Sequence, residues 1–107
     1  MKYRIKFLSE AADDREIIIA YLSQYYKSTV KKFLQLLKKR ISQLKQFPYS
    51  CPIYEDDPDY RRLVVGEYLV FYIINENDKM IEIHRIFHGS RNVEKQLGKA
   101  ENSKDDV

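Results

Sequence analysis

The spacing of apolar residues changes twice along this chain, and this change limits the possible folds more than any other feature. At the start, Tyr3, Ile5 and Phe7 alternate with basic residues, which predicts a half-buried strand. Apolar residues then recur at helical spacing up to Leu44 and return to strand-like runs after Tyr60. This order predicts an α+β fold with the element order β-α-α-β-β-β.

Two helices are predicted in the middle part. The first runs from Glu10 to Tyr26 with Ser9 as N-cap and acids in its first turns, and its apolar positions are Ile17, Ile18, Tyr21, Leu22 and Tyr25. The second is capped by Ser28 or Thr29 and stopped by Pro48, and its apolar stripe is Val30, Phe33, Leu34, Leu37, Ile41 and Leu44. A connection of about two residues makes the helices antiparallel neighbours, whose stripes need a sheet to cover.

Three strand candidates follow a loop that holds all three prolines. "YRRLVV" ends at a Gly66-Glu67 turn signal, "YLVFYII" is apolar on both faces and suits a central strand, and "KMIEIHRIF" follows the turn "NEND". We expect a helical hairpin packed on a mainly antiparallel four-stranded sheet. Residues 1–97 are predicted to be a single domain, ending in a short helix capped by Ser90, and 98–107 a flexible tail.

Length and composition exclude several classes. A chain of 107 residues fits one domain. It has no apolar run near 18 residues, so no transmembrane helix is expected, and its start does not resemble a secretory signal. Cys51 is the only cysteine, which excludes an intrachain disulfide and a multi-cysteine zinc site. We expect a cytoplasmic protein with no cofactor and no metal.

Charge is spread unevenly, although the net value is only +3. Between Ile17 and Tyr54 there is no acidic residue, and this stretch carries Lys27, Lys31, Lys32, Lys38, Lys39, Arg40 and Lys45. A basic helix between acidic segments suggests an anionic partner. The alternative is an ordinary solvated helix face.

The stretch "IEIHRIFHGSRNV" holds the main candidate site residues. His84 and His88 are four apart on a strand, so both are predicted on one face, while Arg85 points the other way beside Ile83 and Phe87 and is partly buried near the sheet edge. The histidines are either hydrogen-bonded residues at the core edge or an acid and base. Beyond the strand, Arg91 is expected on an exposed turn, where it can contact a macromolecular target.

The tyrosines allow two interpretations. They can stack on RNA bases, or fill core edges with their hydroxyls at the rim, and we favour the second. The residues concerned are Tyr21, Tyr25, Tyr26, Tyr49, Tyr54, Tyr60, Tyr68 and Tyr72.

Three features together resemble a known family: the element order, the stretch "FPYSCPIYEDDPDYRRLVVGEYLVFYII", and the ending "IHRIFHGSRNV". The ending is similar to the His-Gly-x-Arg-Asp motif of ParE-type proteins, with Asn92 in place of the Asp. Over residues 2–97 the chain resembles the RelE/ParE superfamily, the toxins of type II toxin–antitoxin modules. The resemblance implies a cognate antitoxin whose carboxyl-terminal segment folds on binding.

The resemblance implies one of two activities. RelE-type members cleave messenger RNA on the ribosome without a metal, using basic side chains and often a late tyrosine; ParE-type members inhibit DNA gyrase. Here Leu69 stands where RelE-type members tend to carry an arginine on the middle strand. Gly89 follows His88, where they tend to carry an arginine directly after the histidine or lysine of the last strand. The late tyrosine is also missing, since no tyrosine follows Tyr72. We therefore favour a gyrase inhibitor that is not an enzyme.

The residues that would contact the target are Arg61, Arg62, His88 and Arg91. The alternatives are a ribosome-dependent nuclease that uses His84, His88 and Arg91, or a non-toxic protein that only binds the antitoxin.

Overall fold

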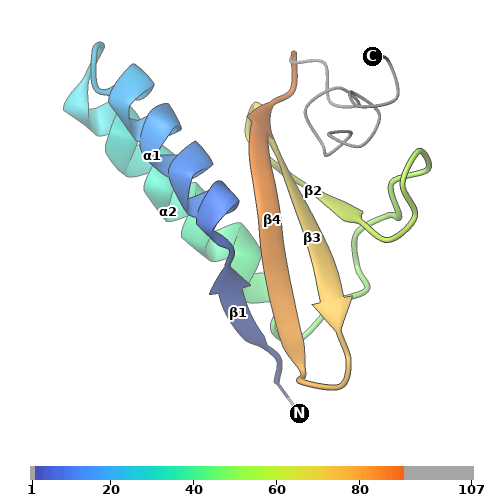
Figure 1. Cartoon of the computed structure of the whole chain (residues 1–107). Coiled ribbons are helices and arrows are strands. Elements are labelled where there is room, and N and C mark those ends of the chain that lie inside the picture. Colours follow the sequence, from blue (N-terminus) through green and yellow to red (C-terminus); the bar gives the residue numbers. More distant parts are fainter. Residues whose placement is uncertain (1, 91–107) are drawn as a thin grey trace.

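The computed structural model describes residues 2–90 and has the predicted element order. Its elements are β1 (Arg4–Phe7), α1 (Ser9–Leu22), α2 (Lys27–Gln43), β2 (Arg61–Val65), β3 (Tyr68–Asn75) and β4 (Met80–His88). The strands form one sheet in the order β1-β4-β3-β2 (Figure 1). β1 is parallel to β4 and the other neighbours are antiparallel, so the α+β prediction with a mainly antiparallel sheet is confirmed.

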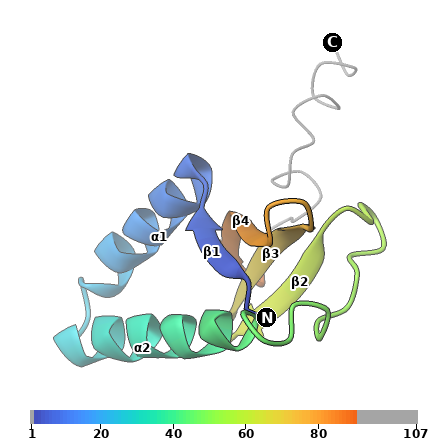
Figure 2. The same cartoon turned by 90° about the horizontal axis from the view of Figure 1, so that it is seen from below.

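Both helices lie on the same side of the sheet, and the core fills the space between them and the strands (Figure 2). From α2 the buried side chains are Phe33, Leu37 and Ile41, and Leu44 follows just after the helix. From the sheet they include Val70, Tyr72, Ile81 and Ile83, each with no exposed surface. Each fully buried large apolar side chain stabilises the fold by about 1.5–3 kcal/mol, so the predicted stripe of α2 is the main helical contribution.

The helix ends differ from those predicted. α1 begins at Ser9 but its N-cap is Leu8, and it stops at Leu22 instead of Tyr26. The hydroxyl of Ser23 donates to the carbonyl of Ala20 at 2.8 Å, which satisfies a carbonyl of the last turn where the helix ends.

The second helix also shifts from its predicted bounds. α2 begins at Lys27, before the predicted caps, and ends at Gln43. Beyond the helix the chain forms tighter turns. The backbone N–H groups of Leu44 and Lys45 each donate to the carbonyl three residues earlier, at 2.9 and 3.1 Å. Pro48 therefore lies beyond these turns and does not set the helix end.

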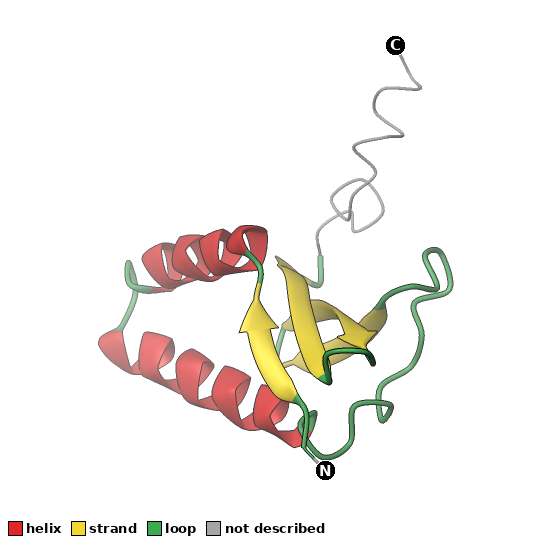
Figure 3. Cartoon of the chain, turned by 60° about the horizontal axis from the view of Figure 1, so that its bottom comes forward, coloured by secondary structure: helices red, strands yellow, loops and turns green. Residues whose placement is uncertain are grey.

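The apolar face of α1 was predicted correctly only in part, since Ile18 is buried and Leu22 packs against the core as expected. Ile17, Tyr21 and Tyr25 are exposed by 66%, 53% and 57%, and the buried positions are Ala11 and Ile18. The reason is the position of α1, which lies beside β4 and β1 while α2 approaches β2 (Figure 3). Of the tyrosines expected to fill core edges, Tyr68 and Tyr72 are buried, whereas the prediction fails for four that are exposed: Tyr21, Tyr25, Tyr26 and Tyr49.

The outer edge of β2 is protected against pairing with another strand. The predicted turn at Gly66 is confirmed. The φ of this residue is +61°, in the left-handed region that glycine adopts more easily than other residues. Along the edge, Arg40 Nε donates to the carbonyl of Val64 at 3.1 Å, and the N–H of Arg62 donates to the carbonyl of Pro52 at 3.1 Å. Occupied edge groups of this kind oppose aggregation through the sheet.

Some predictions fall partly or wholly beyond residue 90. The short helix after Ser90, the domain end at residue 97 and the tail 98–107 lie outside the described residues and stay predictions. Within residues 2–90, no helix is long and apolar enough to span a membrane.

Candidate functional site

A β-bulge divides β4 and decides where its polar side chains point. Arg85 pairs with Phe71 and Ile83 pairs with Tyr72, so His84 is an extra residue opposite the junction of two consecutive β3 residues. A bulge reverses the faces of all residues beyond it, compared with simple alternation. The prediction that His84 and His88 share a face is therefore wrong.

His84 lies on the sheet face that points away from the helices. This face carries a mainly aromatic, apolar group that we call the outer cluster, made of Tyr54, Tyr60, Leu69, Phe71 and Phe87. The ring of His84 meets the ring of Tyr60 edge-on, with centroids 5.3 Å apart. His84 Nε2 lies 3.5 Å from Glu82 Oε1, which is longer than an ordinary hydrogen bond, and it has no closer polar partner in residues 2–90.

His88 lies on the opposite face, at the end of β4. Its ring meets that of Tyr68, a core residue, with centroids 5.3 Å apart. Its Nδ1 accepts the backbone N–H of Ser90 at 3.1 Å, so in the neutral ring the hydrogen is on Nε2. That nitrogen lies 3.3 Å from Glu67 Oε1 and can donate to it. The side chain therefore caps the strand end through local hydrogen bonds.

Arg85 binds the bulge to α1. Its Nε and Nη2 donate to Asp14 Oδ2 and Oδ1 at 2.7 and 3.0 Å, and the N–H of Ile86 donates to Oδ2 at 2.9 Å. We call Asp14, Arg85 and the Ile86 N–H the Asp14 clasp. The hydrogen bonds that Arg85 donates to the Asp14 carboxylate raise the pKa of Arg85. Because β1 pairs with β4 only as far as Ile83, the clasp occupies the edge where strand pairing stops.

The partial burial predicted for Arg85 is confirmed, but its neighbours were predicted wrongly. Ile83 packs in the core on the helix side, whereas Phe87 belongs to the outer cluster. The Arg85 guanidinium lies over the Phe87 ring at 4.6 Å. The bulge explains the error because it moves the two apolar residues to different faces.

The remaining predicted contact residues are not brought together with His88. Arg61 pairs with Tyr72, whereas His88 pairs with Tyr68 toward the other end of β3. Arg61 is half-buried: its Nη1 donates to the Cys51 carbonyl at 2.7 Å. Arg62 is exposed.

Arg91 lies outside the described residues. The involvement of Arg61, Arg62, His88 and Arg91 in target binding stays a prediction.

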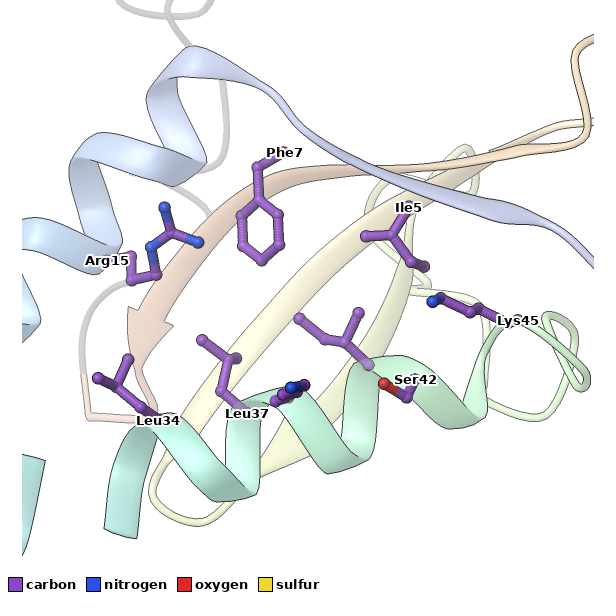
Figure 4. A pocket seen from close by; sticks show the side chains of 9 residues that line it. Ile5, Phe7, Arg15, Leu34, Leu37, Ser42 and Lys45 are labelled. Carbon is purple, nitrogen blue, oxygen red and sulfur yellow. The ribbon is translucent and has the colours of Figure 1, made fainter. Parts of the chain in front are cut away.

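A groove lies between β1 and α2, along the basic helix for which the sequence suggested an anionic partner. It has a volume of about 360 Å³ and is lined by Ile5, Phe7, Arg15, Leu34, Leu37, Lys38, Ile41, Ser42 and Lys45 (Figure 4). Its signal in the sequence was the spacing of Lys38 and Lys45, which lie seven apart and so on one helix face. In residues 2–90, no three His, Cys, Asp or Glu side chains gather closely enough to hold a metal ion.

Comparison of the sequence with models of known protein families identifies the family of this chain. Residues 5–93 match the sequence model of the ParE toxin of the type II toxin–antitoxin system parDE. The chain belongs to the ParE toxin family. The predicted resemblance to RelE/ParE toxins is thereby confirmed, and the chain is a toxin of the type II toxin–antitoxin class. A search of curated protein sequences finds no match.

Solved structures share the ParE-family fold at low sequence identity. The chromosomal ParDE system of P. aeruginosa has 19% identity and a TM-score of 0.69, covering 81% of this chain and 96% of that one. The RelBE2 toxin–antitoxin complex of Mycobacterium tuberculosis has 16% identity and a TM-score of 0.60, covering 82% and 99%. The intact RelBE complex of E. coli has 13% identity and a TM-score of 0.59, covering 83% and 99%. At these identities the likeness shows the fold.

Proposed function

We propose that this ParE-family toxin arrests bacterial growth by binding and inhibiting DNA gyrase, without cleaving RNA itself. The observation that carries the proposal is the bulge in β4, which turns His84 and His88 to opposite faces of the sheet. A general acid and a general base must both reach the reacting phosphate and 2′-hydroxyl. Two histidines separated by the thickness of a sheet do not fit one such site.

The outer face of the sheet gives further support. Leu69, the position where RelE-type members tend to carry an arginine, belongs to the apolar outer cluster. Tyr54 and Tyr60 of this cluster bracket a loop that holds Glu55, Asp56, Asp57 and Asp59. Negative charge close to this face disfavours an RNA backbone.

We further propose a cognate antitoxin that neutralises this toxin in the bacterial cytoplasm. The similar solved structures from M. tuberculosis and E. coli are complexes of a toxin with its antitoxin. The candidate for this chain is the product of the neighbouring reading frame. On the toxin, Arg61, Arg62, His88 and Arg91 are the proposed contacts with gyrase.

Two assays on the purified protein test the proposed target. Supercoiling by gyrase should fall on addition of the toxin, while messenger RNA on programmed ribosomes should stay intact. Arg91→Ala should weaken the inhibition, and His84→Ala, on the sheet face that points away from the helices, should leave it unchanged. Supercoiling that persists together with transcript cleavage, and cleavage that drops about 10²-fold or more in His84→Ala or His88→Ala, would instead establish a nuclease.

Growth provides the third readout. Induction of the chain alone should lower colony counts, and co-expression of the neighbouring gene should restore them. Normal growth with soluble, folded protein present would support the non-toxic binding protein.

A further inference from the structure

The chain leaves the sheet beside His88, at the end of β4. The backbone N–H of Gly89 donates to the Glu67 carbonyl at 2.8 Å, one step beyond the last residue of the strand. A Cβ atom at Gly89 would lie 3.3 Å from this oxygen, closer than most Cβ atoms approach a neighbour, so the position favours glycine. Because glycine leaves the backbone free to rotate, the direction of the chain beyond it depends on a further contact.

That contact comes from the His88 ring. Its Nδ1 accepts the N–H of Ser90 at 3.1 Å, and Ser90 Oγ lies 2.8 Å from the same nitrogen and can donate to it as well. Among residues 2–90, Ser90 has no other hydrogen bond. The second ring nitrogen, Nε2, faces Glu67 Oε1 at 3.3 Å, which favours the tautomer that leaves Nδ1 free to accept.

The His88 ring is itself held by the core. It meets the Tyr68 ring edge-on, with centroids 5.3 Å apart, and the Tyr68 ring lies 5.0 Å from that of Phe33 on α2. Both Tyr68 and Phe33 are buried. His88 therefore connects the position of Ser90 to the packed interior, although its hydrogen bonds with Ser90 lie at the surface.

We propose that His88 is a positioning residue for the inhibition: its Nδ1 holds Ser90 and thereby sets where Arg91, the next residue, meets the target. The inference rests on the proposed function and gives His88 an indirect part in the contact with gyrase. It requires a neutral ring, because a protonated histidine carries a hydrogen on both nitrogens and cannot accept the Ser90 N–H. Inhibition should therefore weaken as the pH falls through the range in which histidines titrate.

Titratable side chains from the neighbouring elements surround the His88 ring or line the hollow of about 480 Å³ beside it. They are Asp14 and Tyr21 of α1, Glu67 of the β2–β3 turn, Tyr68 of β3 and Arg85 of β4. Arg85 and Asp14 are bound to each other, which leaves Glu67 as the anion that pairs with a protonated His88. Protonation thus strengthens the contact at Nε2 and removes the acceptor at Nδ1.

Two substitutions separate positioning from the other roles of the ring. In His88→Asn the side-chain oxygen can accept the N–H two residues on, as in an Asx-turn, whereas His88→Phe keeps a ring against Tyr68 and loses the acceptor. Supercoiling by gyrase is titrated with each purified variant, and circular dichroism checks folding. His88→Asn should inhibit within about twofold of the unaltered toxin, and His88→Phe about three- to tenfold more weakly, as expected for one lost hydrogen bond.

The matched control is His84→Phe, the same change at the other of the two histidines in the sequence, which should leave inhibition unchanged. This variant lies on the sheet face that points away from the helices, where its ring does not contact Ser90.

The pH dependence gives a second measurement. From about pH 8 to about pH 5, inhibition by the unaltered toxin should fall relative to inhibition by His88→Asn, which has no titrating group at this position. The ratio of the two removes the pH dependence of gyrase itself. In NMR spectra, the amide signal of Ser90 should shift over the same range in the unaltered toxin and stay in place in His88→Asn. This comparison decides the case even if His88→Phe does not fold.

The possible outcomes separate the positioning role from the proposed function. Equal losses in His88→Asn and His88→Phe, full inhibition by His88→Phe, or a pH dependence that His88→Asn shares would overturn the positioning role and leave gyrase inhibition standing. A Ser90 amide that does not respond to pH would do the same. If the unaltered toxin does not inhibit supercoiling at any pH, the proposed function is wrong, and the positioning role falls with it.

Discussion

Two carboxylates at opposite ends of β4 each accept three hydrogen bonds from residues 2–90, but they differ in burial. Asp14 holds the bulge through Arg85 and the Ile86 N–H, and its side chain is 11% exposed. Near the β3–β4 turn, Glu76 accepts the hydroxyls of Tyr3 at 2.8 Å and of Tyr49, and the Lys79 ammonium at 2.9 Å, and its side chain is 44% exposed. We call this second group the Glu76 clasp.

The comparison shows that the number of hydrogen bonds does not set their contribution to stability. Around Asp14, water is largely excluded, so the loss of the carboxylate leaves a backbone N–H and a guanidinium poorly solvated. Around Glu76, water can replace each donor. The Glu76 clasp does affect titration: hydrogen bonds from Tyr49, Lys79 and Tyr3 lower the pKa of Glu76 to about 2.

The largest effect is expected from Asp14→Ala. It removes three hydrogen bonds from the part-buried bulge, including both from Arg85. Breaking a fully buried pair costs 3–5 kcal/mol, and the partial exposure of Arg85 reduces the expected loss to about 2–3 kcal/mol. Urea denaturation measures the free energy of unfolding. A loss under about 0.5 kcal/mol would mean that the two clasps do not differ as their burial suggests.

An intermediate effect is expected from Arg85→Lys. Lysine keeps the positive charge and loses the planar fork that binds both oxygens of Asp14, so unfolding should become easier by about 1–2 kcal/mol. Arg62→Lys, the same change at an exposed position of β2, is the control and should stay within about 0.5 kcal/mol. Equal losses of unfolding free energy in the two variants would show that the paired hydrogen bonds from Arg85 to Asp14 add no stability of their own.

The two clasps also show which parts of the structure could be predicted from the sequence alone. The strand and helix order and the core stripe of α2 followed from hydrophobic periodicity, because that signal is local. Asp14 could only be interpreted as an acid near a helix start, and Glu76 as part of the turn "NEND". Their partners Arg85 and Tyr3 lie 71 and 73 residues away along the chain, and no local pattern indicates such contacts.

The bulge at His84 was hidden for a different reason. Strict alternation is the simplest interpretation of a strand, and an inserted residue leaves no mark in "IEIHRIFH". One extra residue moved His88 and Phe87 to the faces opposite those predicted. Since the choice between a nuclease and a binding protein depends on whether the histidines meet, this single residue matters more for function than the misplaced helix ends.

The smallest effect is expected from Glu76→Gln, and pH distinguishes it from the Asp14 changes. Because the folded-state pKa of Glu76 is lowered from 4.5 to about 2, its contribution is fully present above pH 4.5 and is lost as the pH falls toward 2. The difference in unfolding free energy between Glu76→Gln and the unaltered protein should therefore be smaller than for Arg85→Lys at pH 7, and should shrink through this window. Glu55→Gln, at an exposed position in the loop, should show no such change. A difference that persists unchanged down to pH 2 would mean that the ionised carboxylate is not what joins Tyr3 and Tyr49 to the turn.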